Sequence, residues 1–241
     1  MLKAHVEAST EFSIFLSGFL VKFGILGIYS VIAINNNVMI SNLFSSLALI
    51  GIVDSLIKIV GQVDLKRVVA LTTVIEANWM LLCLISPSRF LVEVGYLLIF
   101  IHCMTTTIEF YIVEFIYRRY GTRNLNKVSG LYTLYPNLSK VLLLSLLIVI
   151  GLPGTTIFTL KLIFFTNLVQ YSFTYFMVLL FSFMLAMPII FIKIFMLLRG
   201  GLICNSTNIR FTRDLTSVEL LAILPPIVFS LVGGLLIFII L

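Results

Sequence analysis

The chain has 241 residues, of which 61% are hydrophobic and 11% are charged, and its mean hydropathy is +1.18. Soluble globular domains carry about 25% charged residues, so this chain lacks the polar side chains needed to cover a water-exposed surface. The composition therefore excludes a soluble domain and predicts an integral membrane protein. The net charge of +6 does not indicate nucleic-acid binding, because the cations fall between apolar segments.

Seven apolar segments are long enough to cross a bilayer as helices, which takes about 20 residues each. In chain order they are Ile14–Ile34, Leu43–Val60, Val68–Ile85, Leu91–Tyr117, Val141–Val169, Phe176–Leu198 and Val218–Leu241. Nothing between them resembles a soluble domain. The prediction is an all-α integral membrane protein with about seven transmembrane helices, forming a single transmembrane domain over residues 1–241.

The cationic residues outside these segments sort to one side of the predicted membrane. The opposite side carries only Arg89. The positive-inside rule then places the N-terminus inside and the C-terminus outside. The residues on the cationic side are Lys3, Lys66, Arg67, Arg118, Arg119, Arg123, Lys127, Lys140, Arg199, Arg210 and Arg213.

The fifth segment is too long for one simple crossing and contains Gly151, Pro153 and Gly154 in its interior. Proline removes a backbone donor and glycine relaxes the helix, so we expect a broken helix at this point. Unwound backbone inside a membrane is tolerated only where protein or a water-filled cavity satisfies it, and broken helices are typical of transporter sites. Lys161 follows the break by two turns.

Four ionisable residues lie well inside apolar segments: Lys22, Glu76, His102 and Lys161. Placing a lysine or an acid at the bilayer centre costs about 2.5–3.5 kcal/mol on insertion scales. A lysine near a helix end can extend to the interface, but Lys22 lies eight residues into its segment. A lone histidine is often a packing residue, although an ordinary pKa near 6.5 suits proton relay. Together the four residues predict a proton or ion pathway.

Three further ionisable residues are accessory candidates. Glu109 follows His102 by seven residues, so both lie on one helix face. Asp54 and Lys58 are spaced four residues apart with the acid first, the order that favours a pair along a helix. Such a pair either neutralises itself or belongs to the pathway, and the spacing does not decide between these alternatives.

The sequence offers no site for a cofactor. Cys83, Cys103 and Cys204 have no paired spacing, so they predict neither a disulfide framework nor a zinc or iron–sulfur site. A glycine-rich phosphate-binding loop is also absent from the sequence. We therefore expect no cofactor in this chain.

Several short motifs resemble subunit 4 of respiratory NADH:ubiquinone oxidoreductase (complex I), a member of the antiporter-like family. They occur in the family's order along the whole chain, although Ser9 stands where the family usually has proline. The matching stretches are Lys3–Ala8, Phe19–Gly24, Asp64–Arg67, Gly121–Arg123, Gly151–Thr155 and Asp214–Pro225.

The resemblance implies a fold of fourteen helices with two inverted five-helix repeats, each containing a broken helix. This chain resembles only the C-terminal half, so we expect the N-terminal half on a separate chain. Lys22 matches the family's lysine in the last helix of the first repeat. His102 matches its histidine in the second repeat, and Lys161 matches the charged residue of the second broken helix.

The function that the resemblance implies is that of a non-redox, proton-translocating subunit of the NADH dehydrogenase membrane arm. Such a subunit couples electron transfer from NADH to ubiquinone to proton pumping through a buried charged relay. The expected partners are other membrane-arm subunits and lipids, with no nucleic acid. The expected location is the mitochondrial inner membrane, with the N-terminus in the matrix and the C-terminus in the intermembrane space.

Two residues depart from the family pattern. Lys161 stands where subunit 4 usually has glutamate, and Glu76 stands where the family often has histidine. The exchange is either a compensating pair that keeps the charge balance or a sign that the outward half-channel is altered. Half of a cation/proton antiporter and a non-pumping structural subunit therefore stay open as alternatives. A retinal protein is disfavoured because the last segment contains no lysine.

Overall fold

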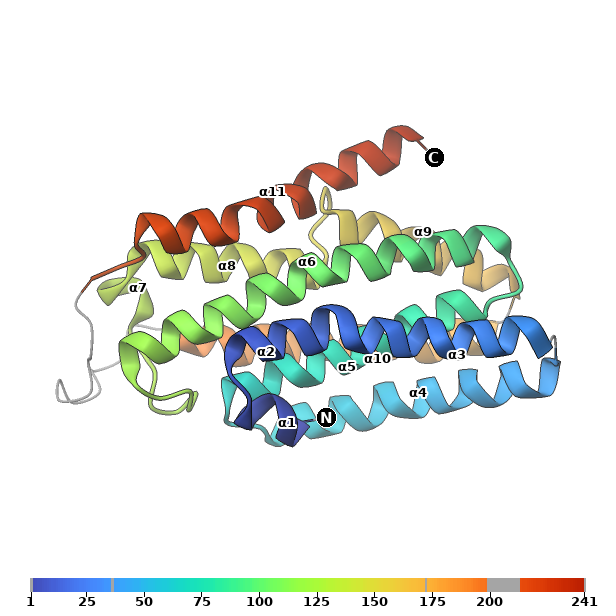
Figure 1. Cartoon of the computed structure of the whole chain (residues 1–241), viewed down its shortest axis with the longest axis horizontal. Helices are drawn as coiled ribbons and strands as arrows, with labels where there is room; N and C mark the ends of the chain where they lie inside the picture. The colour runs from blue at the N-terminus through green and yellow to red at the C-terminus, as the bar shows by residue number, and fades with distance from the viewer. Residues whose placement is uncertain (1, 36, 172, 199–212, 241) are drawn as a thin grey trace.

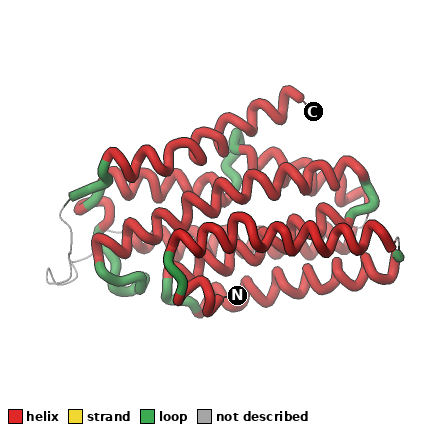
Figure 2. The backbone as a smooth tube through the Cα atoms, viewed as in Figure 1, coloured by secondary structure: helices red, strands yellow, loops and turns green. Residues whose placement is uncertain are grey.

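The computed structural model describes residues 2–35, 37–171, 173–198 and 213–240. Among the residues discussed above, Arg199, Cys204, Arg210 and Leu241 lie outside these ranges. The described parts form a bundle of long helices whose connections gather at its two ends (Figures 1 and 2). The helices are α1 (Leu2–Glu7), α2 (Thr10–Phe15), the π-helical turn η1 (Leu16–Leu20), α3 (Val21–Asn35), α4 (Val38–Gly61), α5 (Leu65–Ile85), α6 (Arg89–Tyr120), α7 (Leu131–Leu134), α8 (Pro136–Ile150), α9 (Thr156–Tyr171), α10 (Phe173–Leu198) and α11 (Ser217–Ile240).

Within the described residues, six of the predicted segments are helical throughout and the fifth is helical on both sides of an interruption, which confirms an all-α membrane fold. In the described part of the chain, four helical units are long and apolar enough to cross a membrane, namely Thr10–Asn35, Val38–Gly61, Leu65–Ile85 and Arg89–Tyr120. Shorter apolar helices follow at Pro136–Ile150, Thr156–Val169 and Ser217–Gly233. The helices begin a few residues before the predicted segments, because polar caps extend them beyond the apolar core. The number of seven crossings stays a prediction.

Local sequence explains where several helices begin. The side chains of Asn37 and Asp64 accept hydrogen bonds from the backbone N–H groups of Met39 (3.0 Å) and Lys66 (2.9 Å). These caps satisfy N–H groups that have no partner within the first turn of a helix. At its other end, α6 stops at Gly121, whose φ of 67° places it in the left-handed region.

Helix α5 is the centre of the bundle and packs against α4 and α6. In its most apolar stretch 72% of the residues are buried, against 22% for the Thr10–Asn35 unit. Side chains on α5 therefore face other helices on most sides, whereas α2 and α3 present one broad face outward.

One end of the bundle, at the left of Figure 1, contains the start of α5, the end of α6, and the starts of α8 and α11. We call this end the basic end, because it carries the described cations of the connections. Arg89 lies at the opposite end, at the start of α6. The cations at the basic end are Lys66, Arg67, Arg118, Arg119, Arg123, Lys127, Lys140 and Arg213.

The fifth predicted segment is interrupted as its sequence indicates. Helix α8 ends at Ile150 and α9 begins at Thr156, and the loop between them is visible in Figure 1. Gly151 and Gly154 have φ values of 85° and 101°, a region that side chains disfavour. The N–H groups of Gly151 and Leu152 donate to Ile148 O (3.1 Å) and Leu147 O (2.9 Å), so the last carbonyls of α8 stay satisfied.

Candidate functional site

Lys161 and Glu76 form an ion pair inside the bundle. The Lys161 Nζ atom on α9 lies 2.7 Å from Glu76 Oε1 on α5, and the two side chains are only 4% and 13% exposed. The Trp79 ring, one turn further along α5, has its centroid 5.8 Å from the same ammonium. Burying two charges is costly unless they are closely paired, so each residue stabilises the charged form of the other. The two departures from the family pattern are thus in direct contact.

Lys22 lies directly after the π-helical turn η1. The N–H of Val21 bonds to the Leu16 carbonyl, which widens the helix by one residue. The Lys22 ammonium, which is buried, donates a hydrogen bond to the Ser17 carbonyl within this turn. The neighbouring Gly18 carbonyl accepts from the Cys103 thiol of α6 at 2.7 Å. The π turn therefore supplies backbone oxygens both to the buried lysine and to the contact with α6.

Charge interactions link these residues into one cluster. Lys22 interacts with Glu76 and Glu109, while His102 interacts with Lys22 and Lys161. His102 is 6% exposed, and its Nδ1 atom has no hydrogen-bond partner among the described residues. We call Lys22, Glu76, His102, Glu109 and Lys161 the buried cluster. It combines two ammonium groups, two carboxyls and an imidazole, which are groups able to carry protons.

Asp54 and Lys58 do not join the buried cluster. They pair with each other along α4, and their side chains are 53% and 51% exposed. The structure therefore places this pair on an outer face of the bundle.

A second buried ionic network, at the basic end, was not anticipated from the sequence. Arg119 is 4% exposed and lies 2.7 Å from Glu219 of α11, and it also donates to the Asp214 carbonyl at 3.0 Å. The Asp214 carboxylate in turn accepts from the N–H groups of Asn137 (2.7 Å) and Leu138 (3.2 Å), which caps α8. In the sequence Arg119 is one of several connection cations, and only its position on the last turn of α6 hints at burial.

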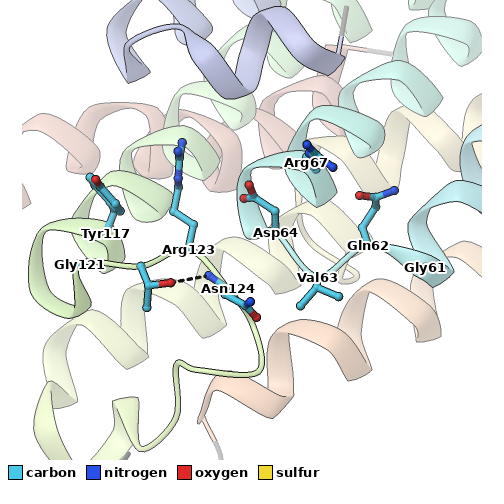
Figure 3. A pocket seen from close by; sticks show the side chains of 10 residues that line it. Gly61, Gln62, Val63, Asp64, Arg67, Tyr117, Gly121, Arg123 and Asn124 are labelled. Carbon is cyan, nitrogen blue, oxygen red and sulfur yellow. Dashed lines mark hydrogen bonds between the residues drawn. The ribbon is translucent and has the colours of Figure 1, made fainter. Parts of the chain in front are cut away.

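A cleft also lies at the basic end, between the α4–α5 and α6–α7 connections (Figure 3). It encloses about 550 Å³ and is lined by Asp64, Arg67 and Arg123, among others. Leu65 N–H donates to Arg123 O (3.0 Å) and Leu125 N–H donates to Val63 O (2.8 Å), so the two connections are joined by backbone pairing. No residue of the buried cluster lines this cleft.

Comparisons with known proteins agree with this architecture. A family described as NADH:quinone oxidoreductase/Mrp antiporter, TM, matches residues 1–188. The chain is 34% identical to NADH-ubiquinone oxidoreductase chain 4 of Paramecium tetraurelia over 155 residues, covering 64% of this chain and 33% of that protein. It is 26% identical to NADH-quinone oxidoreductase subunit M of Rickettsia conorii over 247 residues, covering 96% of this chain and 47% of that protein.

Two solved structures share the fold. A chain of an archaeal membrane-bound sulfane sulfur reductase superposes with a TM-score of 0.86 at 16% identity, covering 97% of this chain and 40% of that chain. A chain of the Mrp complex from Dietzia sp. gives a TM-score of 0.83 at 18% identity, covering 97% of this chain and 52% of that chain. The present chain thus spans about a third to a half of the length of the proteins that it matches.

Proposed function

Because the chain belongs to the NADH:quinone oxidoreductase/Mrp antiporter transmembrane family, we propose that it is a proton-translocating membrane-arm subunit of NADH dehydrogenase. Its relatives are named as subunits of NADH-ubiquinone or NADH-quinone oxidoreductases. In this proposal the chain takes part in the enzyme without a redox centre of its own, and Lys22, Glu76, His102 and Lys161 carry protons through the bundle.

The observation that carries the proposal is the buried ion pair between Lys161 and Glu76. While the pair is closed, the carboxylate stabilises the ammonium. When the pair opens, a buried ammonium without a counter-charge releases its proton more readily. We assign this proton to the Nδ1 atom of His102, which has no hydrogen-bond partner among the described residues. Opening and closing of one ion pair thereby couples a conformational change to proton movement.

The proposal includes further membrane-spanning helices packed beside this part of the subunit. The present chain spans only 33% to 47% of the curated relatives above. Helices α2 and α3 present an outward face on which such helices can pack. Other membrane-arm subunits and lipids complete the surroundings.

The proposed location is the mitochondrial inner membrane, because the relatives include NADH-ubiquinone oxidoreductase chain 4 of Paramecium tetraurelia. The described cations gather at the basic end, and the positive-inside rule places that end in the matrix. The N-terminal helix α1 then lies on the matrix side and the end of α11 on the intermembrane-space side.

The test begins with mild detergent extraction and a native gel stained for NADH dehydrogenase activity. Mass spectrometry of the active band should find this chain together with other membrane-arm subunits. In the same complex, Lys161→Met should impair proton pumping more than assembly, because methionine has a similar length but carries no exchangeable proton. Normal pumping in an assembled Lys161→Met complex would show that Lys161 takes no part in the relay.

The family description also names Mrp antiporters, and the structural similarity to an Mrp complex chain keeps one alternative open. Under this alternative the chain is half of a cation/proton antiporter. Sodium-dependent proton exchange in vesicles that contain no NADH dehydrogenase would support it. Migration of the chain only within an NADH-active band would count against it.

A further inference from the structure

Glu109 is a partly buried carboxyl within the membrane-spanning helix α6, and the relay above gives it no role. It lies on α6, two turns from His102 and nearer the basic end. No described residue donates a hydrogen bond to its carboxyl or lies within ion-pair distance of it, although its charge interactions reach Lys22, Glu76 and Lys161. Burying an unpaired carboxylate is costly, so a carboxyl in such a place can take up a proton instead.

A small enclosed cavity adjoins Glu109 on the side of the basic end. Its volume is about 20 Å³, and Ser145 of α8 supplies a second polar group to its lining. Most of the remaining lining is apolar and comes from α5, α6, α8 and α10, including Val69, Val113 and Ile194. A cavity of this size holds about one water molecule, and a water needs polar partners such as a carboxyl and a hydroxyl.

The depth of Glu109 places it between this cavity and the relay. The backbone of Gly95 on α6 lies against Cys83 and Leu84 of α5. Because the two helices run in opposite directions, Glu109 lies level with the first two turns of α5, and Glu76 lies further from the basic end. The cavity agrees with this register, since Leu65 and Val69 line it together with Glu109. A proton entering from the basic end through the cavity would therefore meet Glu109 before it reaches the Lys161–Glu76 pair.

We propose that Glu109 is the carboxyl through which protons from the basic end enter the buried cluster. A water in the cavity receives a proton from the basic end and passes a proton to the carboxylate, so that an O–H bond forms on Glu109 and the water is left neutral. That bond breaks when the proton passes on to the cluster, which restores the carboxylate. The step needs no electron donor or further reactant, and it rests on the proposed function as a proton pathway.

The first test uses infrared spectroscopy and pumping measurements on the purified, assembled complex. Glu109→Gln should remove one carbonyl band of a protonated carboxyl that shifts in deuterated water. It should also lower proton transfer through this chain by about 10²-fold, because a proton-transferring group is lost. Glu109→Asp should restore most of the pumping. Glu93→Gln on the same helix is the matched control, since Glu93 is 64% exposed at the opposite end of the bundle.

The second test blocks the cavity and leaves Glu109 in place. Ser145→Val should fill the cavity, so the Glu109 band should remain while its exchange in deuterated water slows. Ser139→Val is the control, because Ser139 is also buried on α8 but does not line the cavity. Unchanged exchange in Ser145→Val, or normal pumping in Glu109→Gln, would overturn the role of Glu109.

These outcomes separate the two proposals. If Lys161→Met stops pumping while Glu109→Gln pumps like the unmodified complex, the relay stands and the entry role of Glu109 is wrong. If Lys161→Met pumps normally, the proposed function fails. The exchange experiment then still decides whether water from the basic end reaches Glu109 through the cavity.

Discussion

Two lysine–acid pairs in membrane-spanning helices of this chain behave differently. Asp54 and Lys58 are four residues apart on α4 and are each about half exposed, whereas Lys161 and Glu76 are 85 residues apart and almost fully buried. The local pair follows from helix geometry alone. The distant pair exists only because α5 and α9 pack together. A charged residue within an apolar segment is therefore a stronger candidate for the proton pathway when its partner lies on another helix.

The strongest test of this difference compares Lys161→Met with Lys58→Met in the assembled complex. The first removes the cation of the buried pair and should lower proton transfer through this chain by about 10²-fold, the usual contribution of a proton-transferring group. The second should leave pumping unchanged. Proton uptake by proteoliposomes during NADH oxidation measures the effect of each substitution. Equal effects would show that the buried pair and the exposed pair do not differ in their role in pumping.

Arg119→Ala extends the comparison to the basic end. Removing one partner of a buried ion pair typically costs about 3–5 kcal/mol, because the remaining charge is left unpaired. Arg119 additionally donates to the carbonyls of Phe115 (3.1 Å) and Asp214 (3.0 Å). Thermal unfolding in detergent should show this loss. Arg118→Ala is the control, since Arg118 pairs only with its neighbour Glu114 on the surface of α6 and should change stability little.

His5 provides a test by pH outside the membrane-spanning helices. Burial, together with the charges of Lys66 and the N-terminus, lowers the pKa of His5 from 6.5 to about 4. The neutral ring stacks on Phe110 with centroids 5.4 Å apart. Because the unfolded chain binds the proton more readily, this contribution to stability is complete above about pH 6.5 and is lost as the pH falls towards 4.

The size of that loss is on the order of 2–3 kcal/mol at most, from about 1.4 kcal/mol per unit of pKa. Melting temperatures recorded between neutral pH and pH 4 measure it. His5→Gln should show a flatter profile over this range, because glutamine does not titrate. An unchanged slope in His5→Gln would assign the acid sensitivity to other groups.

Gly154→Ala tests the interruption that brings Lys161 to its position. The φ of 101° at Gly154 is strained for any side chain, although no atom lies within 4 Å of an added Cβ. The expected cost is about 1–2 kcal/mol. Gly24→Ala is the matched control, because Gly24 is helical and equally open. Alanine there should be neutral or slightly stabilising.

The smallest effect is expected for the double change Asp54→Asn with Lys58→Met. Exposed pairs of this spacing contribute about 0.3–0.5 kcal/mol. Thermal unfolding should therefore be nearly unchanged. A large loss of assembly in the complex would instead show that another chain packs on this face of α4.

Much of the fold could be predicted because it depends on local sequence. Apolar length located the helices, and Gly151, Pro153 and Gly154 located the interruption. The burial of Lys22, His102 and Lys161 followed from their distance to the segment ends. The alternatives for Lys161 and Glu76 included a compensating pair, and their contact agrees with that alternative. Their roles in proton transfer stay predictions.

The remaining features depend on contacts between distant parts of the chain. No sequence pattern indicated the π turn that presents the Ser17 carbonyl to Lys22. Lys193 was similar: its ammonium donates to the carbonyls of Val60 (2.7 Å) and Gln62 (2.6 Å) at the end of α4. Arg119 was likewise grouped with the surface cations, because its partners Asp214 and Glu219 follow about a hundred residues later.

Helix α11 joins the two buried networks. Near its start, Glu219 pairs with Arg119, and further along, its Ser230 carbonyl accepts a hydrogen bond from Thr156 at 2.6 Å. Thr156 is the first residue of α9 and precedes Lys161 by five residues on the same helix. A displacement of α11 along its axis at the basic end therefore reaches the first turn of α9. Helix α11 thus couples the basic end mechanically to α9. The loop at Gly151–Gly154 allows α9 to move with α11 while α8 stays in place.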